Sequence, residues 1–142
     1  MSALFKIVTK IHVWLYRSSG GKRASSMGGK DIALLTTKGR KTGVERTVPL
    51  MCFADGADRI VIGSKGGAPE DPAWFLNLKA NPNVTVQLGA DVYPARAVVT
   101  EPADREKLWA KVKSEAPQFA AYEKKTTRVI PVVRLIRADR VN

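Results

Sequence analysis

The sequence predicts a mainly β fold of the α+β class, in which six antiparallel strands close into a small barrel with flanking helices. Two observations predict it. Six short apolar runs are separated mostly by hairpin turns, and the strand–helix–strand alternation of parallel sheets is missing. The 142 residues suffice for one domain with a substantial core. We expect residues 1–30 to form an amphipathic helix and a flexible linker, and residues 31–142 to form the single barrel domain.

The first eighteen residues have apolar side chains at helical spacing and basic side chains between them, which predicts an amphipathic helix. Two interpretations of this helix stay open: it packs against the domain, or it lies on an anionic membrane surface. The segment lacks the apolar core and cleavage site of a signal peptide. Residues 18–30 have the Gly- and Ser-rich composition of a linker.

The first two strands flank the most informative segment of the chain, residues 36–43, with the sequence TTKGRKTG. Apolar runs at 32–35 and 48–51 predict the strands, and Gly39 and Gly43 predict a turn whose backbone is open to a ligand. Three cations and three threonine hydroxyls lie in this segment, so it suits a phosphate or a carboxylate. An ordinary solvated hairpin with a charged tip remains the alternative.

A second glycine segment follows a short predicted strand at 59–63. Residues 64–72 read SKGGAPEDP and lead into a predicted helix over 73–80, where Asp71 can cap and Pro72 can take the first helical position. A strand, a glycine loop and a helix N-terminus in this order offer backbone N–H groups, a helix dipole and a lysine to an anion.

The remaining residues predict three more strands and two helices. Residues 84–88 and 92–99 alternate as a hairpin, in which Pro94 indicates an edge or a bulge. Residues 102–115 form a predicted amphipathic helix with a short helical segment after it, and residues 129–136 form the sixth strand.

The net charge of +11 is concentrated in residues 1–46, which hold ten Lys and Arg against two acidic residues. Such a field attracts nucleic acid, anionic lipid or a small ligand with several negative groups. Nucleic acid is disfavoured, because the basic third lacks helix-turn-helix, zinc-finger and RNP patterns. Cys52 is the only cysteine and His12 the only histidine, so we expect no metal site and a reducing, cytoplasmic location. Two glycine–cation loops in such a chain favour an anionic cofactor that performs the chemistry itself.

Several motifs, in this order over residues 30–136, resemble the deazaflavin-dependent nitroreductase family of mycobacteria and relatives. They are LLTTKGRKTG at 34–43, PL at 49–50, SKGGA at 64–68, PAWFLNL at 72–78, NP at 81–82, then Tyr122, Thr126, Arg128 and IPV at 130–132. The resemblance implies a split β-barrel that binds coenzyme F420. The reduced deazaflavin ring of this coenzyme would pass hydride to quinones, activated enones or nitroaromatics.

The resemblance also implies roles for individual residues. The phosphate and acidic tail of the coenzyme would be held by Arg40, Lys41, Thr42 and Gly43, with Lys38 nearby. The other implied coenzyme-binding residues are Thr36, Pro49 and Met51 at the ring edge, Ser64, Lys65, Gly66 and Gly67 around the ring and phosphate, and Trp74 and Asn77 in the wall. For Trp74 core packing, and for Asn77 a hydrogen bond to backbone, stays the alternative. As catalytic residues, Ser64 and Tyr122 would donate hydrogen bonds to the acceptor oxygen as charge develops there.

The sequence departs from the family pattern at Phe119 and near Ala116, where the nitroreductase that names the family has tyrosines. Fewer hydroxyls in the pocket favour quinone or enone reduction over nitro reduction. Two other classes stay open: a non-catalytic or FMN-type split-barrel protein, and a basic module that binds nucleic acid or a membrane surface. Peripheral contact of residues 1–18 with the inner face of the cell membrane belongs to the expectations.

Overall fold

The computed structural model describes residues 13, 16–17, 26–27 and 30–139. Most of the predicted helix and linker in residues 1–30, His12 included, lies outside the described residues. The described elements are β1 (Ser26–Met27), β2 (Lys30–Lys38), β3 (Glu45–Asp55), β4 (Asp58–Ile62), the short 3-10 helix η1 (Lys65–Gly67), α2 (Ala73–Ala80), β5 (Asn83–Leu88), β6 (Asp91–Val99), α3 (Pro102–Glu115), α4 (Gln118–Lys124) and β7 (Val132–Arg137).

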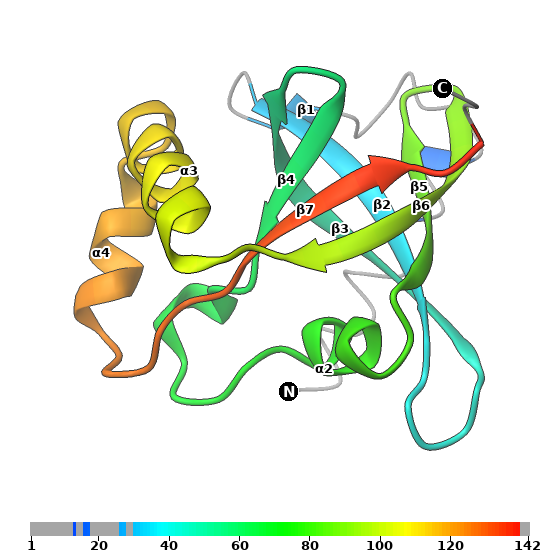
Figure 1. Ribbon diagram of the computed structural model, residues 1–142, viewed down its shortest axis with the longest axis horizontal. Coiled ribbons are helices and arrows are strands. Elements are labelled where there is room, and N and C mark those ends of the chain that lie inside the picture. The colour runs from blue at the N-terminus through cyan, green and yellow to red at the C-terminus, as the bar shows by residue number, and fades with distance from the viewer. Residues whose placement is uncertain (1–12, 14–15, 18–25, 28–29, 140–142) are drawn as a thin grey trace.

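Six antiparallel strands close into a barrel, as the sequence predicts (Figure 1). Their order is β2–β3–β4–β7–β6–β5, and β5 closes the ring by pairing with β2. Leu35 is the partner of Val48 in β3 and of Val86 in β5. The two-residue β1 pairs only with the start of β2. Helices occupy the two long connections, between β4 and β5 and between β6 and β7.

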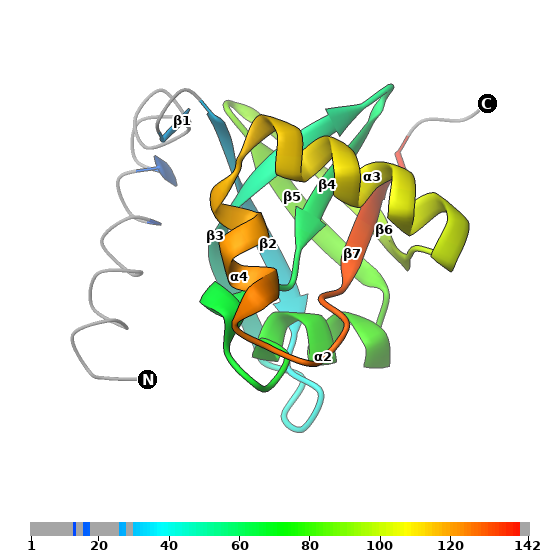
Figure 2. The same cartoon turned by 90° about the vertical axis from the view of Figure 1, so that its left-hand side faces the viewer.

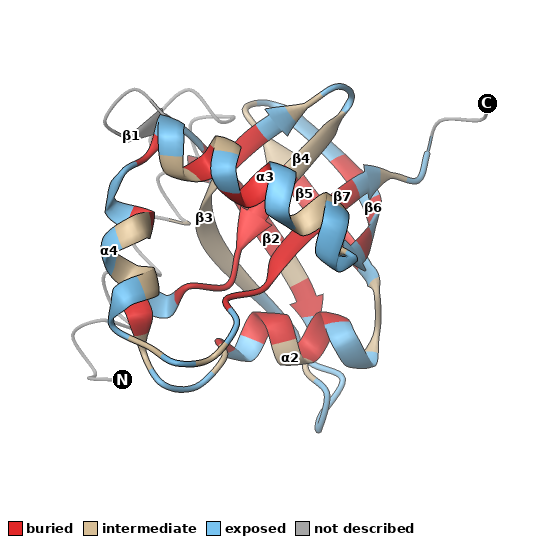
Figure 3. Ribbon diagram, turned by 60° about the vertical axis from the view of Figure 1, so that its left-hand side comes forward, coloured by how far each residue is buried: buried red, intermediate tan, exposed pale blue. Residues whose placement is uncertain are grey.

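The inner core fills the barrel with the side chains that alternate inward along each strand. Helix α2 lies across one end of the barrel and contributes apolar side chains to the same core (Figure 3). Among its members are Ala33, Leu35, Cys52, Val61, Trp74, Phe75, Leu78, Val86, Ala95, Val133 and Leu135. Because no side chain in this list is more than 8% exposed, the barrel is a packed core and leaves no central channel.

Two further clusters cover part of the outer surface of the barrel. Helices α3 and α4 pack Leu108, Trp109 and Phe119 against Phe53 and Ile60 on β3 and β4 (Figure 2). On the other side, Tyr16 packs against Ile32 and Leu34 of β2. The hydroxyl of Tyr16 donates a hydrogen bond to the carbonyl of Ile32 at 2.8 Å and accepts one from the amide of Gly89 at 2.8 Å. The tyrosine thereby links the first helical residues to the barrel.

Three local predictions need correction. Asp71 does not cap α2, because its carboxylate binds the guanidinium of Arg128 at 2.8 Å, and Pro72 itself is the N-cap residue. The last strand begins at Val132 and not at 129. Pro94 lies inside β6, between two neighbouring strands, but opposite the end of β7, where the amide of Ala138 donates to its carbonyl. The missing N–H of this proline therefore costs no ladder hydrogen bond.

Cys52 predicts how the stability of the barrel depends on pH. Burial in the inner core raises the pKa of this thiol to about 11 from its ordinary value of 9.0. The folded state therefore holds the proton more tightly than the unfolded state, so its stabilising contribution is present below pH 9 and is lost as the pH rises through 11. We expect the free energy of unfolding to fall by roughly 2 kcal/mol more in the wild type than in Cys52→Ala over that range, measured by urea titration. Equal slopes would contradict this burial effect.

Candidate active site

An outward-facing strip of side chains on β2 and β3 forms the centre of the candidate site. Thr36 of β2 and Thr47, Pro49 and Met51 of β3 alternate with inward residues and are each half-buried. The hydroxyl oxygens of Thr36 and Thr47, which are register partners, lie 2.7 Å apart. The strip therefore combines a hydrogen-bonding end with an apolar end.

The hairpin loop 39–44 lies at the threonine end of the strip. Its turn is closed by hydrogen bonds from the Gly39 amide to the Val44 carbonyl at 2.8 Å and from the Gly43 amide to the Gly39 carbonyl at 2.7 Å. Gly43 has a φ of 72°, and a Cβ built there would meet nothing within 4 Å. The hydroxyl oxygen of Thr42 accepts a hydrogen bond from the Val44 amide at 3.2 Å. The backbone at the tip is thus open to a ligand.

The cations at this end of the strip are exposed and carry no ion pair with any described residue. Lys38 is the last residue of β2, so only Arg40 and Lys41 stand on the loop itself. Three positive charges within four residues create a local field that suits a phosphate or carboxylate. Arg17 adds a fourth cation next to the strip, where its Nη2 donates to the Thr47 hydroxyl at 2.9 Å.

The side-chain amide of Asn77, on α2, makes hydrogen bonds with residues of this hairpin. Its Oδ1 accepts hydrogen bonds from the backbone N–H and the Nη1 of Arg40, both at 3.1 Å, and its Nδ2 donates to Thr37 at 3.2 Å. The side chain is 4% exposed, and all three partners belong to the hairpin. Trp74 likewise lies in the inner core, 8% exposed, against Phe75. These contacts favour a positioning role for Asn77 and a packing role for Trp74, and their place in the coenzyme wall stays a prediction.

The glycine segment 64–67 lies towards the apolar end of the strip. Lys65, Gly66 and Gly67 follow one another with φ values of 46°, 65° and 89°. A left-handed conformation costs a non-glycine residue such as Lys65 roughly 1 kcal/mol. A Cβ at Gly66 would meet open space, whereas one at Gly67 would lie 2.7 Å from the carbonyl oxygen of Tyr122. One glycine is therefore open to a ligand and the other is needed for packing against α4.

Side chains near this segment set its local electrostatics. The ammonium of Lys65 donates to a carboxylate oxygen of Glu70 at 2.8 Å, and this hydrogen bond holds the pKa of Glu70 below its ordinary value. Ser64 is buried, at 7% exposure. Tyr122 is half-buried on α4, with its ring edge-on to Phe119 at 5.5 Å between centroids. The two predicted catalytic residues therefore lie near the end of the strip that is next to α4.

The two glycine segments do not lie side by side. Figure 1 shows the hairpin loop and the glycine segment at different ends of α2. The strip on β3 runs from Glu45, beside the hairpin loop, to Met51, which packs against both outer clusters and near Tyr122. Six strand residues at about 3.4 Å each separate its ends by roughly 20 Å. A ligand that contacts both segments must be long, apolar at one end and anionic at the other, and a deazaflavin coenzyme with an acidic tail fits this description.

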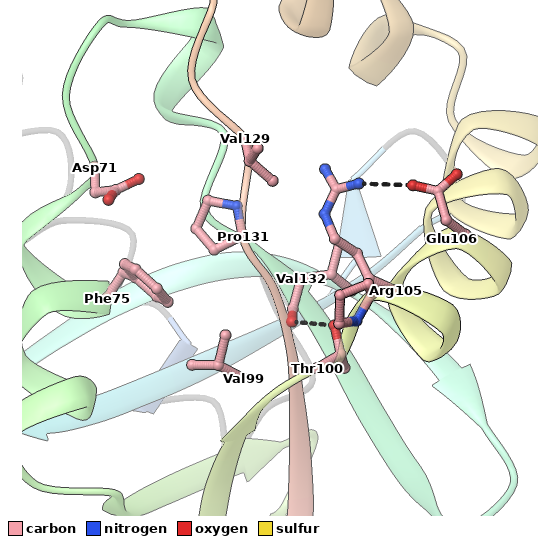
Figure 4. A pocket seen from close by; sticks show the side chains of 10 residues that line it. Asp71, Phe75, Val99, Thr100, Arg105, Glu106, Val129, Pro131 and Val132 are labelled. Atoms are coloured by element: carbon pink, nitrogen blue, oxygen red, sulfur yellow. Dashed lines mark hydrogen bonds and ion pairs between the residues drawn. The ribbon is translucent and has the colours of Figure 1, made fainter.

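A separate cavity of about 470 Å³ lies behind the glycine segment, between α2, the start of β7 and α3 (Figure 4). Phe75, Val99, Val129 and Pro131 line it, and Arg105 borders it while donating to the Ile130 carbonyl at 2.8 Å. None of the residues predicted for coenzyme binding lines this cavity. At the edge of this cavity, the Gly63 amide donates a hydrogen bond to the carbonyl of the lining residue Pro131 at 2.9 Å.

Sequence reasoning missed three residues. Thr47 has the same strand parity as Pro49 and Met51, so the alternation of β3 was a signal that could have found it. Arg17 gave no such signal, because its contact with Thr47 joins positions 30 residues apart. The sequence indicates Arg128 only as part of a motif, because its partners lie 57 to 65 residues away in the sequence.

The closed barrel and its long, basic-ended strip define a class of protein: split-barrel proteins that bind an anionic redox coenzyme. Comparison with known families makes the class specific, because the family of F420H(2)-dependent quinone reductases matches residues 8–136. The chain belongs to this family. The sequence-based expectation of a reductase that depends on coenzyme F420 is thereby confirmed, and the quinone is the acceptor that the family description names.

Individual relatives agree with this assignment. An F420H(2)-dependent quinone reductase of Mycobacterium tuberculosis (strain H37Rv) is 36% identical over 132 residues, which cover 90% of this chain and 89% of that protein. The solved structure of the F420-H2 dependent reductase FDR-A is 42% identical with a TM-score of 0.68, covering 73% of this chain and 92% of that chain. A second solved structure, described as a domain-swapped dimer, is 35% identical with a TM-score of 0.72, covering 89% and 92%.

Proposed function

We propose that this protein transfers a hydride from reduced coenzyme F420, bound along the outward strip of β3, to a quinone. The observation that carries the proposal is the strip itself. At one end it has an open glycine and cations that form no ion pair with a described residue, and Ser64, Lys65 and Tyr122 lie towards the other end. Lys38, Arg40, Lys41, Thr42 and Gly43 would hold the anionic tail. Thr36, Pro49, Met51 and the segment 64–67 would hold the ring and the adjacent phosphate.

When bound, the reduced deazaflavin supplies a hydride, which is the two-electron equivalent that a quinone needs. The protein's own residues position the reactants. Ser64 and Tyr122 donate hydrogen bonds to the carbonyl oxygen of the acceptor, where negative charge develops as the hydride arrives. A proton from solvent completes the hydroquinone, so no strong protein acid is required. The apolar Pro49 and Met51 exclude water from the ring edge.

An anaerobic assay tests this function. The purified protein is mixed with reduced F420 and menadione, and the return of the oxidised coenzyme is followed spectroscopically. We expect turnover that depends on both the protein and the quinone. Fluorescence titration with FMN in parallel separates this reductase from an FMN-type or non-catalytic barrel. Binding of FMN in preference to F420, or absence of oxidation with any quinone, would refute the proposal.

Lys41→Ala tests the tail site. We expect the Kd for oxidised F420 to rise about tenfold. The rise should be larger for forms with long glutamate tails than for short ones, because a longer tail brings more carboxylates that the missing ammonium group would have bound. Lys107→Ala, which removes an exposed lysine from α3 instead, serves as the matched control and should leave the Kd unchanged. An unchanged Kd in Lys41→Ala would show that the anion site lies elsewhere.

The acceptor range extends the proposal to activated enones, with nitroaromatics as poorer acceptors. Phe119 and Ala116 support this ranking, because both are buried in the outer cluster and neither brings a hydroxyl to the site. Rates with menadione, a cyclic enone and a nitroimidazole, measured with the same coenzyme, test it. Nitro reduction as fast as quinone reduction would contradict the ranking.

A cytoplasmic location with peripheral membrane contact through residues 1–18 remains part of the proposal. Within the described part of the chain, no helix is both long and apolar enough to cross a membrane. The basic, amphipathic pattern of residues 1–18 supports contact with anionic lipid. Co-sedimentation with vesicles containing phosphatidylglycerol should decrease with added salt, and absence of sedimentation at low salt would remove this part of the proposal.

A further inference from the structure

Arg128 binds the glycine segment 64–67 and the residues on either side of it through all three nitrogens of its guanidinium. Nε donates to the Ala68 carbonyl at 2.9 Å, Nη1 to the Gly63 carbonyl at 3.1 Å, and Nη2 to the Ser64 carbonyl at 2.9 Å. Nη1 also donates to the carboxylate of Asp71 at 2.8 Å. One side chain from the connection between α4 and β7 therefore donates hydrogen bonds to three carbonyls and one carboxylate between residues 63 and 71.

The segment that Arg128 holds has an unfavourable backbone. Among the described residues, Lys65 is the only non-glycine residue with a positive φ, and two glycines with positive φ follow it. Internal hydrogen bonds of the segment are few: the Gly67 amide donates to the Ser64 carbonyl and the Ala68 amide to the Lys65 carbonyl. Such a conformation persists only where surrounding groups enforce it. Arg128, whose side chain is 15% exposed, is one such group and lies outside the segment.

We propose that Arg128 is a positioning residue for coenzyme binding, which keeps Lys65 and Gly66 in the conformation that receives the coenzyme. The inference rests on the proposed function, since it requires the segment 64–67 to bind the coenzyme. Four of the five N–H donors of Arg128 bind three carbonyls and a carboxylate, so we infer that it acts on the coenzyme through the segment. A lysine at this position would keep the charge beside Asp71 but not the fork that spans the carbonyls.

Kinetics of four single variants and one double variant test this role. In Arg128→Gln we expect the Kd and KM for the coenzyme to rise about tenfold while kcat at saturating coenzyme stays within about threefold and the KM for menadione is unchanged. Arg128→Lys should recover part of the loss in Tm but keep most of the rise in coenzyme KM. The matched control is Arg134→Gln, whose guanidinium binds Asp55, Asp58 and Asp104 away from the site. It should lower the Tm without changing the coenzyme KM.

Lys65→Ala distinguishes failure of this inference from failure of the proposed function. If Lys65→Ala leaves the coenzyme Kd unchanged, the glycine segment is not part of the site and the proposed function must be revised. If Lys65→Ala raises the Kd but Arg128→Gln does not, only the positioning role is refuted. The double variant Arg128→Gln with Lys65→Ala should raise the Kd less than the product of the two single effects, because both act on one contact. Fully multiplicative effects would also refute it. Should Arg128→Gln not fold, Arg128→Lys and Asp71→Asn provide the same comparison.

Discussion

Gly67→Ala is expected to lower the free energy of unfolding by roughly 3 kcal/mol, the largest stability effect of any single methyl group at the site. Gly67 has a φ of 89°, and a Cβ there would lie 2.7 Å from the Tyr122 carbonyl oxygen and 2.8 Å from Cβ of Lys125. Both neighbours belong to α4 or its C-terminal end, so neither can move without shifting the helix. Coenzyme binding should weaken as well, because the shift displaces Tyr122. Urea titration and fluorescence titration with F420 measure the two effects.

Gly66→Ala is the matched control for this experiment. Its φ of 65° imposes a similar backbone cost, but the added methyl group meets nothing within 4 Å. We expect a loss of only about 1 kcal/mol, so the difference between the two variants isolates the packing against α4. Equal losses would show that backbone conformation alone determines the role of Gly67.

Asn77→Ala is expected to have the second largest effect, because it removes a buried amide that makes three hydrogen bonds to the hairpin. The Arg40 amide and the Thr37 hydroxyl would lose a partner, and Thr37 is only 1% exposed. A loss of about 2 kcal/mol in the free energy of unfolding follows from buried polar groups of this kind. Arg40 would also lose its fixed position, so we expect the coenzyme Kd to rise about fivefold, with kcat unchanged.

Asn77→Asp tests the same contacts without removing volume. The carboxylate keeps an acceptor for both Arg40 donors, and the Thr37 hydroxyl can donate to it in place of accepting. Coenzyme affinity should therefore fall less than in Asn77→Ala. If the aspartate variant loses as much affinity as the alanine variant, Asn77 contacts the coenzyme directly and the positioning role is wrong.

Much of the fold could be predicted from local signals. Helices α2 and α3 begin and end where the sequence predicts. Pro72 and Pro102 lie at their starts, and Pro82 follows the end of α2. The hairpins followed from glycine turns between alternating strands. Strand length was underestimated at Thr36–Lys38, since these polar residues gain their strand conformation from register partners on β3, and pairing across a barrel leaves no local sequence signal.

The candidate site was predictable as a set of residues but not as an arrangement. The cations of the hairpin and the two open glycines follow from composition and turn chemistry. The separation of the two glycine segments by α2 does not, because it depends on how the closed barrel places connections that are distant in sequence. Asp71 illustrates the same limit. Asp71 binds a guanidinium 57 residues away instead of capping the helix, because a charged donor forms a stronger hydrogen bond than a helix N-terminus offers.

The length of the strip on β3 has a consequence for evolution of the enzyme. In the proposed binding mode, the residues that hold the tail and those that face the acceptor lie near opposite ends of β3, so a change at the hairpin would alter coenzyme affinity and leave the rate of hydride transfer unchanged. On this proposal, a relative with other charges at the hairpin would suit a coenzyme of another tail length without a change in the residues around the ring.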